Sequence, residues 1–283
     1  MNKTLSPIIQ AEELLKIYQK DHVIVVDVSN GKNAKDNFKK KHLDKALFVD
    51  LNTQLAAIPD DFANGGRHPL PTIERFTKLL QLIGITENSH VVVYDDKNGA
   101  NAAARFWWML KSVGLKKVQV LNGGMQQAEQ IGFPINNKIE IPKTVPPFKA
   151  ENWKLPLATI QEVEENSLNE NHLIIDVREN IRYRGENEPI DLIAGHIPGS
   201  INMPFSTNLK ENGTFLSPQD LKSKYQKILS KYNQENIIIH CGSGVTACHS
   251  ILAMDYAGLE IPKLYVGSWG EWSRNNKPIA IEI

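Results

Sequence analysis

The sequence predicts an α/β protein built from two similar domains in tandem, each a mostly parallel β-sheet flanked by helices. Three observations support this. The chain has 283 residues, enough for two ordinary domains. Short apolar runs rich in β-branched residues alternate with segments of helical periodicity, which indicates strands covered on both faces. The second half also repeats the first half weakly but in order, as expected of an internal duplication.

The duplication is visible as four pairs of blocks that follow one another in the same order in both halves. The pairs are residues 23–28 with 173–177, 41–49 with 195–203, 90–95 with 236–241, and 120–124 with 265–268. Most of these blocks are apolar, β-branched runs that predict strands. Because fully apolar strands are buried on both faces, they favour parallel sheets.

Between the expected strands lie segments in which apolar residues recur at helical spacing. These segments are residues 12–19, 73–83 and 100–113 in the first half, and 158–165, 218–231 and 247–257 in the second half. The stretch 135–156 instead contains four prolines among charged residues and asparagines, which is typical of an extended linker. We therefore expect an N-terminal domain over residues 1–135, a linker over 136–157 and a C-terminal domain over 158–283.

Composition excludes several classes of protein. The 32 basic residues balance the 32 acidic residues, so nothing suggests a nucleic-acid partner. No apolar run is long enough to span a bilayer, and residues 1–7 lack the hydrophobic core of a signal peptide. Two cysteines in a chain of this length argue for a reducing compartment. We expect a cytoplasmic protein with neither a nucleic-acid nor a membrane partner.

The most informative motif is a thiol placed where an apolar strand meets a helix. The run Ile237–Ile239 leads to Cys241, and a Gly/Ser loop connects it to the expected helix 247–257. In such a loop the backbone N–H groups point inward, and unpaired N–H groups at a helix start carry partial positive charge. We expect the Cys241 thiol to ionise there and act as a nucleophile. The loop holds no lysine or arginine, so backbone dipoles must supply the activation.

The second cysteine, Cys248, lies seven residues after Cys241, which is not a usual spacing for zinc ligands. On a helix it would stand about 10 Å beyond the loop, too far for an easy disulfide. We therefore interpret Cys241 as a lone reactive thiol and Cys248 as a small core residue. A buried and inert Cys241 is the alternative.

The loop Cys241–Cys248, with the sequence CGSGVTAC, resembles the active-site loop of rhodanese-type sulfurtransferases in its 3-mercaptopyruvate variant. Three further blocks resemble signatures of that family: D-x-R at 176–178, GHIPGS at 195–200 and GSWGEW at 267–272. The blocks occur in the family's order and spacing, and the resemblance extends over nearly the whole chain. It implies two tandem rhodanese-like domains.

The resemblance also implies a reaction. A sulfane sulfur would move from an anionic donor, with 3-mercaptopyruvate favoured, through a persulfide on Cys241 to cyanide, a small thiol or thioredoxin. No metal and no organic cofactor is implied, because the persulfide itself carries the sulfur. In the first half, Asp95 takes the place of Cys241, and the loop Asp95–Gly99 holds two carboxylates and no thiol. We therefore expect residues 1–135 to form a non-catalytic domain.

One arginine is a candidate for binding the donor. Arg182 falls at the position of the family's substrate-anion arginine, four residues after Arg178. A guanidinium at a strand end faces the ligand crevice and binds a carboxylate bidentately. A surface ion pair with Glu179 or Glu186 is the alternative. We interpret Arg178 and Arg184 as structural residues.

The remaining substrate-binding candidates are the loop residues Gly242, Gly244, Val245 and Thr246. The two glycines let the backbone curl around one point. Thr246 adds a hydroxyl toward the same point, or it caps the helix that follows.

The family also suggests a Ser–His–Asp relay that helps to deprotonate the substrate thiol. Ser243 fits the serine and His68 fits the histidine, although a surface loop residue is the alternative for His68. Asp50 fits the aspartate, with more intervening residues than in the family, and Asp61 is a rival. Arg67, beside His68, could also face the site.

One departure from the family bears on the donor. The 3-mercaptopyruvate enzymes carry a second substrate-binding arginine shortly before the GHIPG block, whereas residues 188–194 contain none. Thiosulfate is the alternative donor, but thiosulfate enzymes place cationic side chains in the loop, and Gly242 and Ser243 provide none. A thiol phosphatase would need an arginine six residues after Cys241, where Ala247 stands. A non-catalytic persulfide carrier is a third alternative.

Overall fold

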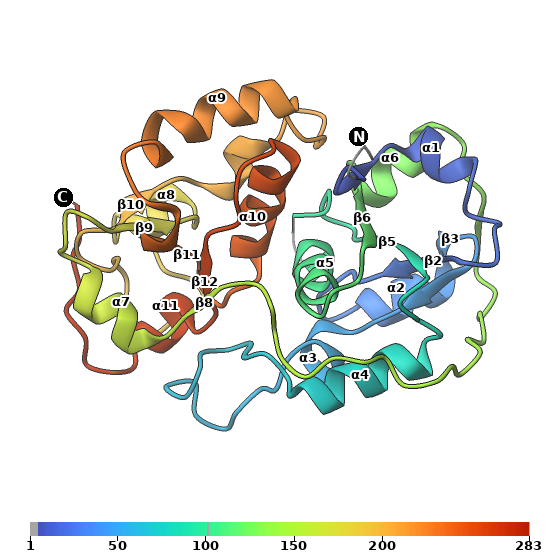
Figure 1. The fold of residues 1–283 in the computed structure, drawn as a ribbon, viewed down its shortest axis with the longest axis horizontal. Helices are drawn as coiled ribbons and strands as arrows, with labels where there is room; N and C mark the ends of the chain where they lie inside the picture. Colours follow the sequence, from blue (N-terminus) through green and yellow to red (C-terminus); the bar gives the residue numbers. More distant parts are fainter. Residues whose placement is uncertain (1–4, 101, 283) are drawn as a thin grey trace. The chain divides into compact units, whose positions relative to one another are not determined.

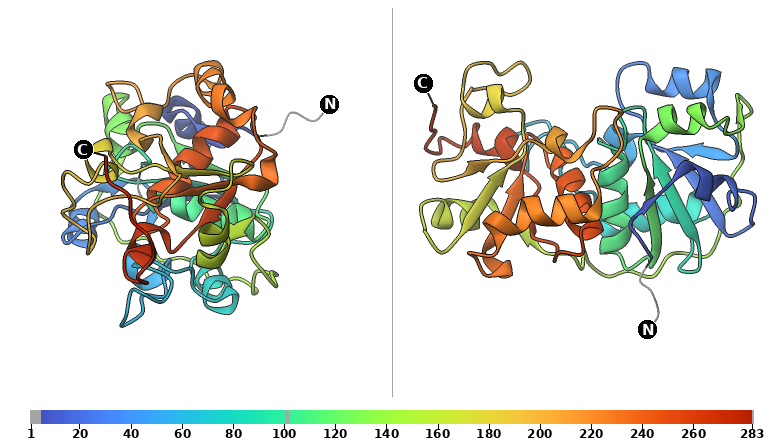
Figure 2. Two further views of the ribbon diagram at one scale, coloured as in Figure 1. Left: turned by 90° about the vertical axis from the view of Figure 1, so that its left-hand side faces the viewer. Right: turned by 90° about the horizontal axis from the view of Figure 1, so that it is seen from above.

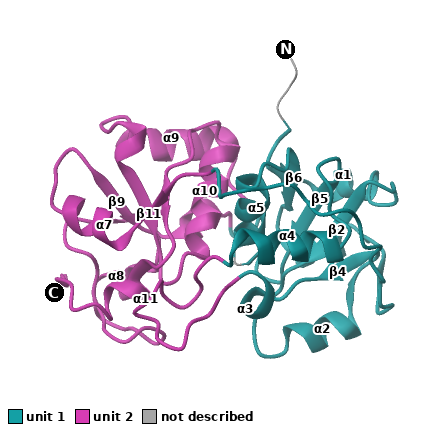
Figure 3. Ribbon diagram, turned by 60° about the horizontal axis from the view of Figure 1, so that its bottom comes forward, with its two compact units in different colours: residues 1–55, 71–154, 211–214 teal, residues 56–70, 155–210, 215–283 magenta. Residues whose placement is uncertain are grey.

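The computed structural model describes residues 5–100 and 102–282. Two expectations touch residues outside these ranges. The stretch 1–7, expected to lack a signal-peptide core, includes residues 1–4, and the expected helix 100–113 includes Asn101. The chain divides into two compact units (Figure 3). Unit 1 comprises residues 1–55, 71–154 and 211–214, and unit 2 comprises residues 56–70, 155–210 and 215–283. Segment 56–70 thus lies in the first half of the sequence but belongs to unit 2; the boundaries at 135 and 158 stay predictions.

Unit 1 contains a five-stranded parallel sheet in the order β1-β6-β5-β2-β4. Its strands are β1 (Ile8–Ile9), β2 (Val23–Asp27), β4 (Ala46–Phe48), β5 (His90–Tyr94) and β6 (Lys117–Leu121). The register pairs Val23 with His90 and Asp27 with Tyr94, so the carboxyl ends of β2 and β5 lie level. Two short strands, β3 (His42–Leu43) and β7 (Ile135–Asn136), pair antiparallel beside it.

Helices cover both faces of this sheet (Figures 1 and 2). They are α1 (Ala11–Leu15), α2 (Ala34–Lys40), α3 (Leu51–Gln54), α4 (Ile73–Leu82), α5 (Ala102–Ser112) and α6 (Gly124–Gln130). Apolar residues of α1 and α6 pack with Val25 and Val92 of the sheet in one core cluster. Helix α4 begins where the Thr72 side chain accepts a hydrogen bond from the Arg75 N–H, a normal N-cap.

Unit 2 repeats the architecture, with the strand order β10-β9-β11-β12-β8 and only parallel pairs. The strands are β8 (Leu157–Ala158), β9 (Leu173–Asp176), β10 (Ile201–Asn202), β11 (Ile237–His240) and β12 (Lys263–Tyr265). Read from the opposite edge, as β8-β12-β11-β9-β10, this order matches that of unit 1 strand for strand. The predicted duplication and the predicted parallel α/β sheets are therefore confirmed.

The helices of unit 2 also lie on both faces of their sheet (Figures 1 and 2). They are α7 (Ile160–Asn166), α8 (Asn180–Tyr183), α9 (Pro218–Leu229), α10 (Thr246–Tyr256) and α11 (Ser268–Trp272), with 3-10 turns η1 (Phe205–Asn208) and η2 (Gln234–Asn236). Trp269 and Trp272 of α11 pack with Ile174 and Ile238 of the sheet. None of the helices in the described ranges is long and apolar enough to cross a membrane.

The strand order of unit 2 predicts a ligand-binding crevice at one point of the sheet. After β9 the chain goes to β10 on one side, and it later returns to β11 on the other side of β9. The loops that leave the carboxyl ends of β9 and β11 therefore diverge, and doubly wound sheets bind ligands at such a switch point. Cys241 directly follows β11 and lies at this edge.

Candidate active site

The Cys241 loop is attached to the start of α11 by four hydrogen bonds. The Cys241 and Gly244 N–H groups both donate to Ser268 Oγ, at 3.2 and 2.9 Å, and this hydroxyl donates to the Tyr265 carbonyl at 2.9 Å. The Cys241 carbonyl accepts from the Trp269 N–H at 3.0 Å, and the next carbonyl along the loop accepts from the Gly270 N–H at 2.9 Å. These bonds fix the loop in one curled conformation.

The two loop glycines are needed for different reasons. Gly244 has φ +68°, and a Cβ there would lie 2.6 Å from the Val266 carbonyl oxygen. Gly242 has no such backbone strain, but a Cβ there would lie 2.8 Å from Nη2 of Arg67 and 3.4 Å from Nη2 of Arg182. Curling of the backbone, as predicted, therefore explains Gly244, whereas close approach of two guanidinium groups explains Gly242.

The loop that follows the Cys241 thiol contains a set of open N–H groups. Cys241 is only 1 % exposed. Helix α10 begins at Thr246, with Val245 as N-cap and no side-chain cap bond, so Thr246 is not the cap. Within the described part of the chain, the N–H groups of residues 242, 243 and 245–247 donate to no other residue. Such unpaired N–H groups stabilise an anion at the helix start.

Segment 56–70 brings the predicted histidine to this loop. Nδ1 of His68 lies 2.8 Å from Oγ of Ser243, so the structure places the predicted Ser–His pair within hydrogen-bond distance. The segment is held against α11, because the Gly65 N–H donates to the Glu271 carboxylate at 2.9 Å. Both partners belong to unit 2.

The two aspartate candidates have local partners. Asp50, in unit 1, is the N-cap of α3, and its carboxylate accepts from the N–H and hydroxyl of Thr53, each at 2.8 Å. Asp61, in unit 2, accepts from the Ala63 N–H at 2.9 Å. A relay role for either carboxylate stays a prediction.

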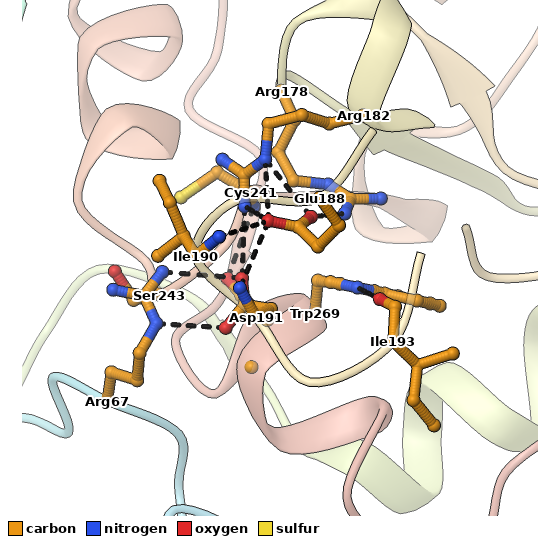
Figure 4. A network of polar contacts seen from close by, with 12 residues as sticks. Arg67, Arg178, Arg182, Glu188, Ile190, Asp191, Ile193, Cys241, Ser243 and Trp269 are labelled. Carbon is orange, nitrogen blue, oxygen red and sulfur yellow. Dashed lines mark hydrogen bonds and ion pairs between the residues drawn. The ribbon is translucent and has the colours of Figure 1, made fainter. Parts of the chain in front are cut away.

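Arg182 lies beside the loop, in a network of charges (Figure 4). Its Nε donates to both oxygens of Glu188, each at 3.0 Å, and its Nη2 donates to Glu188 at 2.7 Å and to Asp191 at 3.1 Å. Arg182 therefore forms its ion pairs with Glu188 and Asp191, and not with Glu179 or Glu186, the alternative partners considered above. On the other side, Arg67 donates through Nε to Asp191 at 2.9 Å.

A second, buried ion pair lies beneath this network. Arg178 is 1 % exposed; its Nη2 donates to Asp176 at 2.6 Å and to the Gly195 carbonyl at 2.7 Å. Its guanidinium also lies 4.7 Å from the centre of the Trp269 ring. These contacts join the D-x-R, GHIPGS and GSWGEW blocks, which explains in physical terms why the three blocks occur together.

Two buried carboxylates of these ion pairs, Asp176 and Glu188, are charged at neutral pH. Burial opposes the charge of Asp176, but Arg178 outweighs burial and holds the pKa of Asp176 below its ordinary value. Burial likewise opposes the charge of Glu188, and hydrogen bonds from Arg182 lower its pKa overall. Burial lowers the pKa of His240, the residue before Cys241. This imidazole is therefore neutral at neutral pH.

Sequence reasoning missed three residues of the site. Ser268 fixes the loop, and Glu188 and Asp191 hold the arginines. The signal for Ser268 was its place in the GSWGEW block. The signal for the two carboxylates was their place in the segment before GHIPGS, where only a missing arginine drew attention. Among the described residues, no group of three or more His, Cys, Asp and Glu side chains is placed to hold a metal ion.

Unit 2 places a buried thiol between a strand and a helix, in a loop with open N–H groups, and unit 1 has an aspartate at the corresponding position. This arrangement is typical of proteins that transfer a group through a thiol. The family comparison gives the particular family. The model of the Rhodanese-like domain matches residues 10–130 and 159–275, so the chain belongs to the rhodanese family, with two such domains.

Relatives in this family act in sulfur transfer. A probable 3-mercaptopyruvate sulfurtransferase of Pseudomonas aeruginosa is 36 % identical over 249 residues, covering 86 % of this chain and 85 % of the relative. The thiosulfate sulfurtransferase of Rattus norvegicus is 34 % identical over 251 residues, covering 87 % and 82 %. Similarity to both groups of enzymes shows that this chain is a sulfurtransferase.

Solved structures of two such enzymes have the same fold as this chain. The 3-mercaptopyruvate sulfurtransferase of Leishmania major matches with a TM-score of 0.77 and 27 % identity, over 95 % of this chain and 74 % of that one. The Escherichia coli protein SseA, described as a 3-mercaptopyruvate sulfotransferase with the rhodanese fold, matches with a TM-score of 0.77 and 26 % identity, over 94 % and 99 %.

Proposed function

We propose that this sulfurtransferase takes sulfur from 3-mercaptopyruvate onto Cys241 and passes it to a thiophilic acceptor. The observation that carries the proposal is the loop that begins at Cys241: it contains open N–H groups, and its Ser243 hydroxyl lies 2.8 Å from Nδ1 of His68. The N–H groups stabilise a thiolate and then a persulfide anion. The hydroxyl–imidazole pair is suited to accept a proton.

In the proposed first step, the Cys241 thiolate attacks the sulfur of 3-mercaptopyruvate and forms an S–S bond. The donor's S–C bond breaks, its electron pair stays on carbon, and that carbon takes up the proton that the donor thiol loses. Pyruvate leaves, and Cys241 holds a persulfide anion. Ser243 and His68 move the proton, and Arg182 binds the donor carboxylate.

In the proposed second step, an acceptor attacks the outer sulfur and restores the Cys241 thiolate. Cyanide, a small thiol or thioredoxin would serve, since each offers a soft nucleophile. Both cysteines are free thiols in the structure. Because the cycle needs a reduced Cys241, we propose a reducing compartment, the cytoplasm.

The charge of the loop distinguishes the two donors. Thiosulfate carries its charge close to the transferred sulfur, where residues 242–246 offer N–H groups but no cationic side chain. The carboxylate of 3-mercaptopyruvate lies further from its sulfur, in the direction where an arginine can hold it. Thiosulfate stays the second candidate, because the thiosulfate enzymes are about as similar to this chain.

The test is a comparison of kcat/KM for the two donors with one acceptor. We expect 3-mercaptopyruvate to be favoured by at least about tenfold, or roughly 1.4 kcal/mol of transition-state binding. Equal or faster turnover of thiosulfate would overturn the choice of donor and leave the sulfurtransferase class intact.

A further inference from the structure

The segment before GHIPGS contributes a carboxylate in place of an arginine. The Asp191 side chain is fully buried (0 % exposed). It contacts Arg67 at 2.9 Å, Arg182 at 3.1 Å and Arg274 at 3.6 Å. A buried carboxylate between arginines fixes their side chains, because separating them would leave an uncompensated charge. Asp191 therefore fixes the guanidinium group of Arg67 and, together with Glu188, that of Arg182.

Both guanidinium groups converge on the residue that follows the nucleophile. The Nη2 atoms of Arg67 and Arg182 lie 2.8 and 3.4 Å from the point where a Cβ of residue 242 would stand. Only glycine leaves room for them there. Arg67 thus approaches the loop even more closely than Arg182, from a segment far away in sequence (Figure 4).

Each arginine keeps donors for a ligand. Arg67 uses Nε and Nη2 on Asp191, and Arg182 uses Nε and Nη2 on Glu188 and Asp191. Neither Nη1 group donates to another residue within the described chain. The two side chains are 18 % and 15 % exposed, so a small anion can reach them without breaking the ion pairs.

The charge of the network suits a single carboxylate. Four arginines (Arg67, Arg178, Arg182 and Arg274) face three carboxylates (Asp176, Glu188 and Asp191), which leaves one positive charge. A donor with one carboxylate would neutralise it.

We propose that Arg67, held in place by Asp191, binds the carboxylate of the sulfur donor together with Arg182. Arg67 is then the second cationic contact that residues 188–194 do not supply. This inference rests on the proposed function for the identity of the donor, but the binding of an anion beside Cys241 is testable without it.

The first test measures steady-state kinetics of Arg67→Ala and Arg67→Lys, with Arg184→Ala as the matched control. Arg184 lies in the same unit, is 40 % exposed and pairs with Glu186 at 2.9 Å. Arg67→Ala should raise KM for 3-mercaptopyruvate at least about tenfold, the loss expected for a charged hydrogen bond, with a smaller change in kcat. Arg67→Lys keeps the positive charge but loses the planar guanidinium with its paired donors. Its KM should therefore lie between those of the wild type and Arg67→Ala. Arg184→Ala should match the wild type.

The second test uses two alkylating probes that differ only in charge. Iodoacetate and iodoacetamide both form an S–C bond with the Cys241 thiolate and release iodide, but only iodoacetate carries a carboxylate. Arg67→Ala should lower the ratio of the two rates, while the iodoacetamide rate stays near that of the wild type and shows that the thiol and its loop are intact.

The results distinguish the role of Arg67 in anion binding from the proposed use of 3-mercaptopyruvate as donor. An unchanged KM together with an unchanged iodoacetate-to-iodoacetamide ratio in Arg67→Ala would overturn the role of Arg67. If the wild-type protein formed no persulfide from 3-mercaptopyruvate, the proposed function would fail, whereas a lowered ratio in Arg67→Ala would still support an anion contact at this residue.

Discussion

Two thiols seven residues apart have different surroundings, although both are buried. The Cys248 thiol lies inside α10 and donates to the Gly244 carbonyl at 3.3 Å, as a small core residue does. Cys241 lies at the junction of β11 and its loop, where open N–H groups gather. Open N–H donors are the surroundings that a thiol nucleophile needs, whereas the Cys248 thiol faces a carbonyl acceptor.

At this scale we expect Cys241→Ser to abolish sulfur transfer while the fold persists. A serine hydroxyl lacks both the low pKa and the sulfur affinity of a thiolate. The measurement is turnover of donor with cyanide, combined with thermal unfolding. Cys248→Ser is the matched control and should retain most activity, since a hydroxyl can keep the bond to the Gly244 carbonyl. Wild-type turnover by the Cys241 variant would disprove the mechanism.

Among the elements, the loops after β5 and β11 show how one architecture surrounds a carboxylate in unit 1 and a thiol in unit 2. In unit 1 the Asp95 carboxylate accepts N–H groups of Lys97 at 2.9 Å, Gly99 at 2.8 Å and Ala103 at 3.1 Å. The loop that surrounds a thiol in unit 2 is therefore filled by its own side chain in unit 1. This is the physical basis for expecting unit 1 to be non-catalytic.

We expect Asp95→Ala to lower the free energy of unfolding by about 3 kcal/mol, because buried N–H groups would lose a charged acceptor. Asp95→Asn keeps one acceptor oxygen and should cost less. Urea unfolding followed by tryptophan fluorescence would measure both changes. The exposed neighbour Asp96 is the control, and Asp96→Ala should change little. A loss no greater in Asp95→Ala than in Asp96→Ala would contradict this account of the loop.

Helix α10 contains a completely buried histidine, His249, whose ring nitrogens have no hydrogen-bond partner among the described residues. Its ring stacks on Phe215 at 4.6 Å, and burial, aided by the charge of Lys224, lowers its pKa to about 3. The folded protein therefore resists protonating this ring, whereas the unfolded chain does not.

We expect His249→Leu to stabilise the protein by about 1–3 kcal/mol at pH 7, since two unsatisfied buried polar atoms are removed. The advantage should grow as pH falls below about 6.5, because only the unfolded wild-type chain takes up a proton there, at 1.36 kcal/mol per pH unit. Unfolding midpoints at pH 7 and pH 5 would measure this. A variant no more stable than the wild type at pH 5 would show that His249 has a partner in solution.

At the scale of the whole molecule, the two units share one strand order, but only unit 2 has a cysteine after its central strand. Duplication preserved the sheet, because its strands depend on apolar patterning that tolerates substitution. We expect that it did not preserve the chemistry, because the central strand of each parallel sheet is followed by Cys241 in unit 2 but by Asp95 in unit 1.

We expect incubation with 3-mercaptopyruvate and no acceptor to add one sulfur atom per chain, on the peptide that contains Cys241. Cyanide should remove it. Intact-protein and peptide mass spectrometry would detect both changes. Labelling of Cys248 alone, or of both cysteines equally, would contradict a single site.

The sequence by itself determined the fold class, the duplication and the place of the candidate nucleophile. The helices expected from periodicity correspond to α1, α4, α5, α7, α9 and α10, whereas the short helices α2, α3, α6, α8 and α11 were not expected. The thiol stands where an apolar run, two glycines and a helix meet. All of these are local features, so reading along the chain is sufficient. The helix expected at 247–257, for example, is α10 at Thr246–Tyr256.

The family resemblance suggested Ser243, His68 and Arg182 as site residues, but only the tertiary structure decided which distant side chains meet at this loop. It places His68 within hydrogen-bond distance of Ser243, ties the loop to Ser268, and brings Arg67 and Arg182 together on Asp191. It also assigned segment 56–70 to unit 2, against its place in the sequence. These contacts depend on how loops from separate elements pack at one sheet edge, and no local propensity encodes that packing.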